Sequence, residues 1–454
     1  MPIHEAQTIA QIVTAPGKGA VGIIRISGDE ALAIGDGLAG GRGMIARAAS
    51  HTIHYGWVHD REGNRLDEAL FMVMHGPRTY TGEDVVEVQC HGGPVAVGEV
   101  LREACARGAR PAEAGEFSRR AFLNGKIDLS RAEAIMDLVE AKSDGALKLA
   151  ARQKSGRTEE LVDGLRAAIL ELIAYIQADL DFPEDDIDRL DKAAYRDRAE
   201  GLAHDLEDLV RTATRGRLYR DGITVALCGR ANVGKSSLLN ALTGRNTAIV
   251  TNIPGTTRDS VEANIQVDGL ALRLIDTAGL RKTDDLVEQI GVDRAKDIVR
   301  GADVIAYCLA APEGLQPVDR AFIEDHRDQV GLLVINQVDL SDMPSPDLPW
   351  PAVRTSALAG TGIDDLGRAL KEAALAEAPA AENALYLTNA RQVSLAETAL
   401  QDLRHFLEAL AMGVSDDLLV IDLQHAWEVL GLITGDTAAD DLLDQIFSQF
   451  CLGK

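Results

Sequence analysis

A glycine-rich segment near the middle of the chain has the residue types that bind nucleotide phosphates. Residues 229–236 read Gly-Arg-Ala-Asn-Val-Gly-Lys-Ser, between an apolar, β-branched run at 223–228 and a helix-forming run at 237–242. Glycines let such a loop turn its backbone N–H groups toward phosphate oxygens, and the following helix adds the partial positive charge of its N-terminus. We expect Lys235 to reach the β- and γ-phosphates and Ser236 to bind Mg²⁺. An accidental glycine turn would require neither the Lys-Ser pair nor both flanks, so the segment predicts a phosphate site.

Two later motifs predict the metal shell and the base. Residues 276–279 read Asp-Thr-Ala-Gly after an apolar stretch and resemble Asp-x-x-Gly, whose carboxylate lies in the Mg²⁺ shell. Residues 336–339 read Asn-Gln-Val-Asp after another apolar run and resemble the guanine-reading Asn-Lys-x-Asp. The Asp339 carboxylate can accept from the ring N–H and the exocyclic amine of guanine, a donor pair that adenine lacks. The motif therefore favours GTP over ATP. Gln337 stands where Lys is usual, which predicts weaker binding without loss of guanine selection.

The predicted nucleotide contacts extend beyond these motifs. Ser356-Ala357 fits the last and weakest guanine motif, with Leu358 where Lys or Arg is common. The predicted GTP-binding residues are Asn232, Val233, Gly234, Lys235, Ser236, Ser237, Thr251, Thr257, Asp276, Thr277, Ala278, Gly279, Asn336, Asp339, Ser356 and Ala357.

The segment between the loop and Asp276 has the composition of a switch. Residues 255–259 read Gly-Thr-Thr-Arg-Asp, and Thr257 could complete the Mg²⁺ shell only when the γ-phosphate is present. An ordinary turn after Pro254 would give a similar pattern.

The residue after Asp-x-x-Gly indicates an unusual route of hydrolysis. Ras-like proteins carry a Gln there that orients the attacking water, whereas this chain has Leu280. Leucine cannot position water, so hydrolysis must recruit another group. Nearby candidates are Asp284, Asp285 and Glu288.

Hydrophobic spacing predicts the elements that position these residues. Residues 1–122 mix strand-like runs with turns, which predicts an α+β domain. Apolar residues then fall three or four apart through 165–180, and the same helical spacing returns in 400–410 and in 442–450 after the nucleotide motifs. A chain of 454 residues suits about three domains.

Composition favours a cytoplasmic protein. The five cysteines have neither metal-ligand nor disulfide-framework spacing, which suits a reducing compartment. The sequence has neither a signal segment nor an apolar run long enough to span a bilayer. A net charge of −25 opposes broad electrostatic capture of RNA, although a partner could bring positive surface and solubility alone would also explain the charge.

Over essentially its whole length, the chain resembles the bacterial tRNA modification GTPase family MnmE, also called TrmE. The resemblance rests on segments 81–84, 89–94, 115–117, 121–126, 255–259, 276–281 and the terminal Cys451-Leu452-Gly453-Lys454. It implies a multidomain α/β and α+β fold with a folate-binding-like N-terminal domain, a discontinuous helical domain and an inserted Ras-like P-loop GTPase domain. The expected ranges are 1–122 for the N-terminal dimerisation domain, 123–216 and 378–454 for the helical domain, and 217–377 for the GTPase domain.

The resemblance also implies a function. The chain would be the GTP-hydrolysing subunit of a complex that adds a carboxymethylaminomethyl or aminomethyl group to C5 of the wobble uridine of tRNA. A 5-formyl- or methylene-tetrahydrofolate would donate carbon, and an MnmG-type flavoprotein partner would carry FAD. The expected assembly is a homodimer that joins this partner in a heterotetramer and acts on tRNA, without a membrane.

Roles of individual residues follow from the same resemblance. Arg25, Glu87 and Lys126 would surround the folate, although without the family each would be interpreted as an ordinary surface charge. Asn232 would bind K⁺ with oxygens from Thr251, Ile253 and Thr256, while Ser236 and Thr257 would bind Mg²⁺. The expected catalytic residues are Glu288, which would orient water, Arg258 in the switch, and Cys451, a candidate for the tRNA chemistry.

Two other functions remain open at the level of sequence. A regulatory GTPase of ribosome assembly would use the same motifs, but it would be expected to carry a basic RNA-binding module, and none is visible. A folate-dependent methyltransferase with a vestigial GTPase domain is disfavoured because the nucleotide motifs are complete.

Overall fold

The computed structural model describes residues 7–181, 192–245, 247–248, 262–277, 296–376, 387–450 and 453. Packing divides the chain into two units, Met1–Ala132 with Thr434–Lys454, and Glu133–Ile433. Several residues singled out from the sequence lie outside the described ranges: Thr251, Ile253, Thr256, Thr257, Arg258, Ala278, Gly279, Leu280, Asp284, Asp285, Glu288 and Cys451.

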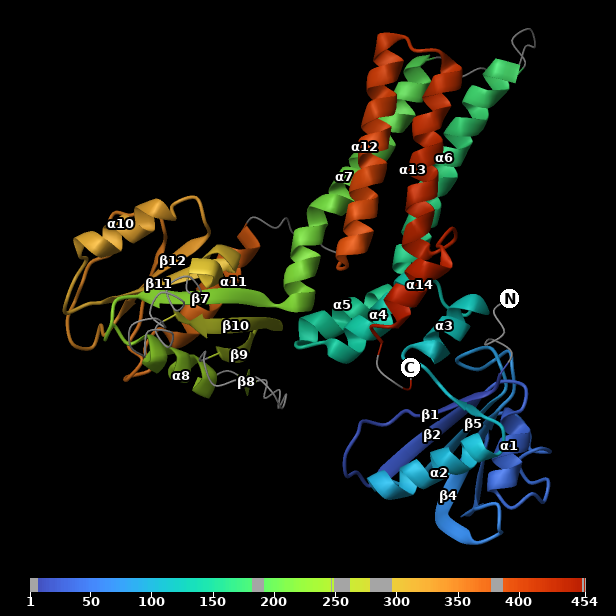
Figure 1. Ribbon diagram of the computed structural model, residues 1–454. Helices are drawn as coiled ribbons and strands as arrows, with labels where there is room; N and C mark the ends of the chain where they lie inside the picture. The colour runs from blue at the N-terminus through green and yellow to red at the C-terminus, as the bar shows by residue number, and fades with distance from the viewer. Residues whose placement is uncertain are drawn as a thin grey trace, which may run out of the picture. The chain divides into compact units, whose positions relative to one another are not determined.

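A six-stranded sheet forms the centre of the first unit (Figure 1). Its strand order is β3-β4-β5-β2-β1-β6, and neighbours are antiparallel except for β1 and β6. Helices α1 and α2 pack on one face, over fully buried Ile24, Phe71 and Val88. The elements are β1 (Ile9–Ile12), β2 (Val21–Ser27), α1 (Ala31–Leu38), β3 (Thr52–His59), β4 (Arg65–Met74), β5 (Val85–His91), α2 (Pro94–Ala106), β6 (Arg110–Pro111), α3 (Glu116–Leu123) and α14 (Asp440–Phe447). The predicted α+β character is confirmed.

Residues from the end of the chain complete this unit. Gly115 has a φ of 68°, and a Cβ there would lie 2.3 Å from the carbonyl oxygen of Phe447. Gly453 fits equally closely, because a Cβ there would lie 2.4 Å from the carbonyl oxygen of Ile12. The described terminal residues thus fold with the N-terminal sheet, and the expected range 378–454 is divided between the two units.

Long helices from both ends of the second unit form one of its two parts. The helices α6, α7, α12 and α13 stand side by side (Figure 1), and their facing sides bury Ile169, Leu206, Phe406 and Leu430. Apolar residues three or four apart fall on one side of a helix, so the spacing predicted from the sequence produces this core. The helices are α4 (Leu129–Glu140), α5 (Asp144–Lys154), α6 (Arg157–Asp181), α7 (Lys192–Asp221), α12 (Ala390–Met412) and α13 (Asp416–Thr434).

A seven-stranded sheet lies in the chain between α7 and α12. Its order is β13-β12-β11-β7-β10-β9-β8, and the first five strands in this order are parallel. The elements are β7 (Ile223–Gly229), α8 (Lys235–Arg245), β8 (Thr247–Ala248), β9 (Glu262–Val267), β10 (Leu270–Asp276), β11 (Val304–Ala310), α10 (Pro317–Asp325), β12 (Gly331–Asn336), β13 (Ala352–Arg354) and α11 (Ile363–Ala376).

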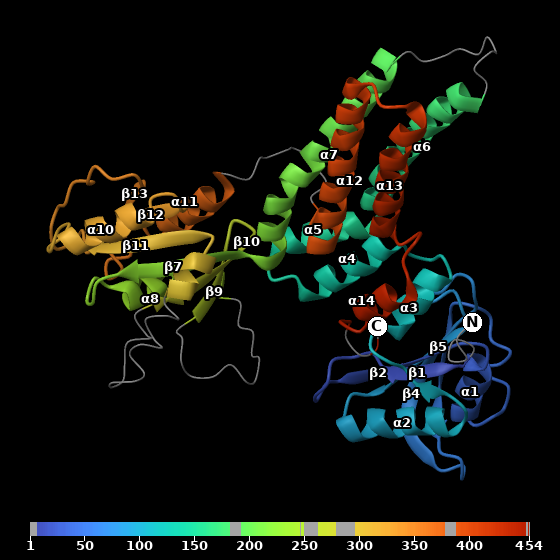
Figure 2. The same cartoon turned by 45° about the horizontal axis from the view of Figure 1, so that its top comes forward.

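Helices cover both faces of this sheet (Figure 2). The core with α8 and α11 lies on one face, and the core with α10 lies on the other. All residues of β11 and β12 are buried, as expected of parallel strands covered on both sides. The carboxyl ends of β7, β10 and β12 meet at one edge, where ligands bind in open parallel sheets. The predicted motifs follow these three strands.

Candidate functional site

The loop after β7 has a backbone that only glycine tolerates at two positions. Gly229 has a φ of 129°, and a Cβ there would lie 2.4 Å from the carbonyl oxygen of Cys308. Gly234 has a φ of 92°, and a Cβ there would lie 2.3 Å from Nδ2 of Asn336. Side chains at either glycine would push the loop away from β11 or β12. The spacing of the two glycines therefore fixes the path of the loop.

The predicted phosphate and magnesium residues come together at the start of α8. Lys235 is buried, and its Nζ donates to the carbonyl oxygens of Gly229 and Arg230 at 2.8 and 2.7 Å. Ser236 Oγ donates to Oδ2 of Asp276 at 2.8 Å, and that carboxylate is almost fully buried. A hydroxyl and a carboxylate oxygen side by side provide hard oxygen ligands of the kind that Mg²⁺ prefers. The fit to a magnesium-bound nucleotide rests on this pair.

Asn336 of the predicted guanine motif also contacts the phosphate loop. Asn336 is buried, its Nδ2 donates to the carbonyl oxygen of Val233 at 3.0 Å, and its Oδ1 accepts from the N–H of Ala357 at 3.2 Å. One side chain thus joins the phosphate loop to the last guanine motif. The Asp339 side chain is exposed and has no hydrogen-bond partner among the described residues, so its carboxylate is available to a ligand. Ser356 Oγ accepts from the N–H of Ala359 at 3.1 Å, which fixes the turn after β13.

Gln337 contacts the loop at the predicted potassium residue. Its Nε2 donates to the carbonyl oxygen of Asn232 at 3.3 Å, and the two residues have φ values of 63° and 65°. The amide therefore contacts the turn of the loop where Lys was expected. Sequence reasoning predicted only a loss at this position and missed this contact.

Arg230 forms a second anchor that sequence reasoning missed. Its Nε lies 3.1 and 3.2 Å from the two carboxylate oxygens of Asp319, which is fully buried at the start of α10. The same carboxylate accepts from Tyr307 Oη at 2.8 Å and from the N–H of Gln316 at 2.9 Å. Burial and the hydrogen bond to Asp319 raise the pKa of Tyr307. The Arg230–Asp319 pair therefore joins the phosphate loop to α10, which lies on the opposite face of the sheet from α8.

Two cysteines next to the loop are core residues. Burial raises the pKa of both Cys228 and Cys308 to about 12. Both thiols therefore stay protonated at neutral pH and cannot act as nucleophiles there. Among the described residues, no group of three or more His, Cys, Asp or Glu side chains could hold a metal ion.

The predicted folate residues lie in the first unit. Arg25 on β2 and Glu87 on β5 face each other in the sheet register, and Nε lies 2.8 Å from Oε1. The Arg25 guanidinium lies 5.3 Å from the ring centre of Tyr80 and 5.4 Å from that of Phe117. Lys126 Nζ donates at 2.8 Å to the carbonyl oxygen of Pro77, in the loop that carries Tyr80. The structure joins Arg25 to Glu87, while Lys126 reaches the neighbouring loop.

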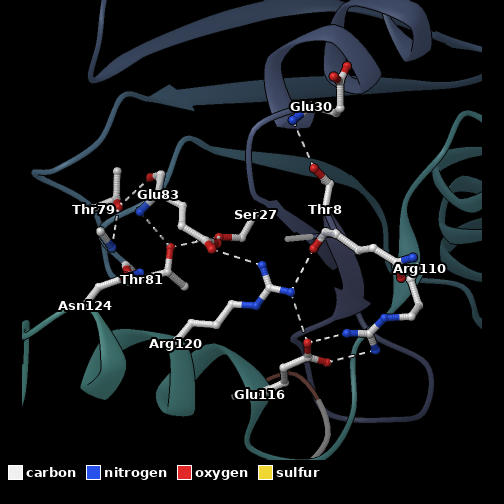
Figure 3. Close-up of polar contacts among 12 residues, drawn as sticks. Thr8, Ser27, Glu30, Thr79, Thr81, Glu83, Arg110, Glu116, Arg120 and Asn124 are labelled. Carbon is white, nitrogen blue, oxygen red and sulfur yellow. Dashed lines mark hydrogen bonds and ion pairs between the residues drawn. The ribbon is translucent and has the colours of Figure 1, made fainter. Parts of the chain in front are cut away.

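A buried arginine supports that loop (Figure 3). Arg120 on α3 donates to Oε1 of Glu83 at 3.0 Å and to Oε1 of Glu116 at 3.1 Å. Ser27 Oγ donates to the other oxygen of Glu83 at 2.6 Å and lies 2.8 Å from Thr81 Oγ1. The segment 81–84 quoted for the resemblance is therefore held to β2 and α3. Sequence reasoning singled out this segment but not Arg120.

No helix within the described ranges is long and apolar enough to cross a membrane.

Comparisons with known proteins cover nearly the whole chain. A family model described as the GTP-binding protein TrmE N-terminus matches residues 8–126, and one described as the MnmE helical domain matches residues 129–451. The tRNA modification GTPase MnmE of Streptococcus pneumoniae (strain Hungary19A-6) is 43% identical over 100% of both chains. The protein of the same name from Geobacillus thermodenitrificans (strain NG80-2) is 43% identical over 99% of this chain and 100% of its own. Among solved structures, the G domain of the T. maritima FeoB iron transporter is 28% identical, covers 34% of this chain and 98% of its own, and has a TM-score of 0.26.

Proposed function

The chain belongs to the MnmE family of tRNA modification GTPases and is a GTPase, and we propose that it is the GTP-hydrolysing subunit of a complex that modifies wobble uridine. The reaction would add a carboxymethylaminomethyl or aminomethyl group to C5, with a tetrahydrofolate donating the carbon bonded to C5, glycine or ammonium supplying the amine, and an FAD-carrying, MnmG-type partner for the redox step. The whole-length family match supports the tRNA role, and the meeting of Ser236 with Asp276 beside the glycine loop supports the GTPase site.

The nucleotide site would work through residues already close together. Lys235, which donates to loop carbonyls, would turn its ammonium to the β- and γ-phosphates, and Ser236 with Asp276 would hold Mg²⁺. Asp339 would accept the two donors of guanine. Gln337 and Asn336 would keep the loop in position through their contacts with residues 232 and 233.

We also propose that K⁺ completes this site. Asn232 lies at the turn of the loop, and Thr251, Ile253 and Thr256 would supply further oxygens from outside the described residues. The cation would supply the positive charge that an arginine finger gives other GTPases, and Glu288 would orient water in place of the missing Gln. Arg258 and Thr257 would act from the switch segment.

Monovalent cations give the direct test of this proposal. GTP turnover in K⁺ should exceed turnover in Na⁺ by tenfold or more, since a transition-state charge contact is worth at least roughly tenfold in rate. Turnover by the Asn232→Ala variant should differ little between the two salts. Equal rates of the unmodified protein in K⁺ and Na⁺ would contradict the cation proposal while leaving the GTPase assignment intact.

The folate would bind on the open face of the N-terminal sheet. The Glu87 carboxylate could pair with pterin N–H donors while Arg25 holds it in place, and the Lys126 cation could meet a carboxylate of the folate's glutamate. The direct ion pair of Arg25 with Glu87 holds the two side chains in one orientation until a ligand arrives.

The same face supports the proposed homodimer. The register aligns Ile53, Met72, Glu87 and Arg25 in one row and Tyr55, Leu70, Gln89 and Ile23 in the next. Ile53 and Tyr55 are 58% and 63% exposed, which is unusual for large apolar side chains on adjacent rows. A second copy on this face would cover them and lie next to the Arg25–Glu87 pair. The heterotetramer with the flavoprotein would be built on this dimer.

Reconstitution tests the function as a whole. Unmodified tRNA should gain the C5 substituent when it is incubated with this protein, the flavoprotein, GTP, K⁺, Mg²⁺, a methylene-tetrahydrofolate as carbon source, and glycine or ammonium as the source of the amine. Mass spectrometry of the wobble nucleoside gives the result, and Cys451→Ser tests the proposed role of that thiol. If the tRNA from the complete mixture lacks the C5 substituent, the proposal is contradicted.

A strain that lacks the gene gives a second test. Normal levels of wobble-uridine modification in that strain would favour a switch in ribosome assembly.

A further inference from the structure

A short basic surface stands out on a strongly acidic chain. Residues 142–157 hold five basic side chains and one acidic side chain, whereas the chain as a whole has a net charge of −25. The five are Lys142, Lys148, Arg152, Lys154 and Arg157, and all are exposed. We call this set the α5 basic surface.

Helix α5 holds three of these side chains on its outer side. Ala146, Leu149, Ala150 and Gln153 are its buried residues, and Gln153 Nε2 donates to Thr388 Oγ1 at 3.1 Å, so one side of the helix is fixed to the unit. Lys148, Arg152 and Lys154 occupy the remaining arc of the helix. Lys142 and Arg157 continue the same charge before and after α5. Figures 1 and 2 show α5 beside α4, below the long helices.

None of the five cations has an ion-pair partner among the residues that the structure describes. Basic side chains on other helices do pair locally, as Arg102 with Glu99 and Arg368 with Asp365 do. Like charges four residues apart, such as Lys148 and Arg152, destabilise a helix. An acidic chain that leaves these cations unpaired at one place has a surface suited to a polyanion.

We propose that the α5 basic surface binds the phosphate backbone of tRNA, an inference that rests on the proposed tRNA function. Lys and Arg neutralise phosphates and release their counterions, which favours RNA even when the rest of the protein repels it. The sequence of α5 has no aromatic residue for stacking on bases, so the contact positions tRNA without reading its sequence. Such a local surface differs from the separate basic RNA-binding module that a ribosome-assembly GTPase would be expected to carry.

Helix α5 is hydrogen-bonded to the turn that precedes β10, the strand that leads to the nucleotide site. The N–H of Gly145 in its first turn donates to the carbonyl oxygen of Gly269 at 2.8 Å, in the turn between β9 and β10. Strand β10 ends at Asp276, which accepts from Ser236. A tRNA held on α5 therefore lies one hydrogen bond from the strand that carries the magnesium carboxylate.

Fluorescence anisotropy with labelled total tRNA tests the proposal on the full-length protein over a range of KCl concentrations. The triple variant Lys148→Gln, Arg152→Gln, Lys154→Gln should bind tRNA roughly tenfold or more weakly at about 0.1 M salt, with a slope of log K against log salt smaller by about 2. A matched variant, Arg42→Gln, Arg196→Gln, Arg300→Gln, removes the same charge from exposed, scattered positions and should retain both affinity and slope. GTP turnover without tRNA should be unchanged in both.

Three results would overturn the proposal. The first is equal tRNA binding by the two triple variants, and the second is no tRNA binding by the unmodified protein. The third is unaltered tRNA binding with lost binding of the flavoprotein, which would make α5 a protein-docking surface. A failed reconstitution of wobble modification contradicts the proposed function but leaves the anisotropy result standing, so the two failures are distinguishable.

Discussion

Arg25 is the residue of the first unit whose contacts best define a ligand site. Its guanidinium is oriented by Glu87 and by two aromatic rings. Little side-chain conformational entropy is therefore lost when a ligand binds. Arg25→Ala should weaken 5-formyl-tetrahydrofolate binding by about tenfold, because a hydrogen bond to a charged group contributes roughly 1.5–3 kcal/mol. Isothermal titration calorimetry measures the change.

Arg65→Ala is the matched control for that experiment. Arg65 is exposed on the same sheet and lies 4.7 Å from the ring centre of Trp57, away from the Arg25–Glu87 pair in the register. Its loss should leave folate affinity unchanged. Equal affinity of the Arg25→Ala variant and the unmodified protein would remove Arg25 from the folate site.

Residue types predicted the phosphate loop well because its signal is local. Residues 229–236 and their flanks specify strand, turn and helix within about twenty positions, and the structure has β7, the loop and α8 there. Arg230 and Asp319 are 89 residues apart, and Arg120 and Glu83 are 37 apart. No periodicity links such pairs, since their contact depends on how distant elements pack.

Among the elements, α4 carries a titratable group at the junction of several helices. Asp137 accepts from Thr388 Oγ1 at 3.1 Å, close to Glu133, which forms a buried ion pair with Arg391 at 2.8 Å. Burial raises the pKa of Asp137 to about 6, against the partial compensation of Arg220 and the Thr388 hydrogen bond. The folded protein therefore binds this proton more tightly than the unfolded chain does.

The sign of the stability change follows from that shift. Below about pH 4 Asp137 is protonated in both states, and the cost of its charge in the folded state grows until about pH 6 and then stays constant. Asp137→Asn should raise the free energy of unfolding at pH 7 by at most roughly 3 kcal/mol relative to its effect at pH 4. Urea unfolding at the two pH values measures this difference.

Asp163→Asn serves as the control because Asp163 is exposed on α6. Its effect should be small and similar at both pH values. A pH-independent effect of Asp137→Asn would mean that the carboxyl group is charged in the folded protein throughout this range.

At the level of the elements, hydrophobic spacing predicted several of the strands and helices correctly. The helical spacing in 165–180 and 400–410 lies in α6 and α12, and the apolar runs before the nucleotide motifs are β7, β10 and β12. Spacing alone could not assign α14 to the N-terminal sheet, because a helical stripe does not say which core it faces.

For the molecule as a whole, the open face of the N-terminal sheet predicts a dimer. Tyr55→Glu should convert the dimer to a monomer, since it would bury an unpaired charge at the centre of the apolar rows. Light scattering coupled to size-exclusion chromatography measures the mass. Val95→Glu, at an exposed position on α2, should leave the dimer intact because α2 covers the opposite face. A Tyr55→Glu dimer would require another interface.

The charge of the whole chain is unevenly distributed, because a net charge of −25 coexists with the α5 basic surface. From the sequence, the net charge opposed broad capture of RNA, and it was compatible either with a partner that binds much of the tRNA or with solubility alone. The proposed tRNA contact on α5 would add a local site on this chain, next to the sheet that carries the nucleotide motifs.

We expect GTP hydrolysis at the 229–236 loop to be required for wobble-uridine modification. A strain lacking the gene is complemented with the unmodified gene, with Ser236→Ala, or with Thr243→Ala, whose hydroxyl only donates to the Leu239 carbonyl oxygen within α8. Mass spectrometry of wobble nucleosides should find full modification with the unmodified gene and with Thr243→Ala. With Ser236→Ala it should find almost none, since the variant loses the hydroxyl that meets Asp276. Full modification with a Ser236→Ala protein that no longer hydrolyses GTP would show that GTP hydrolysis is not required.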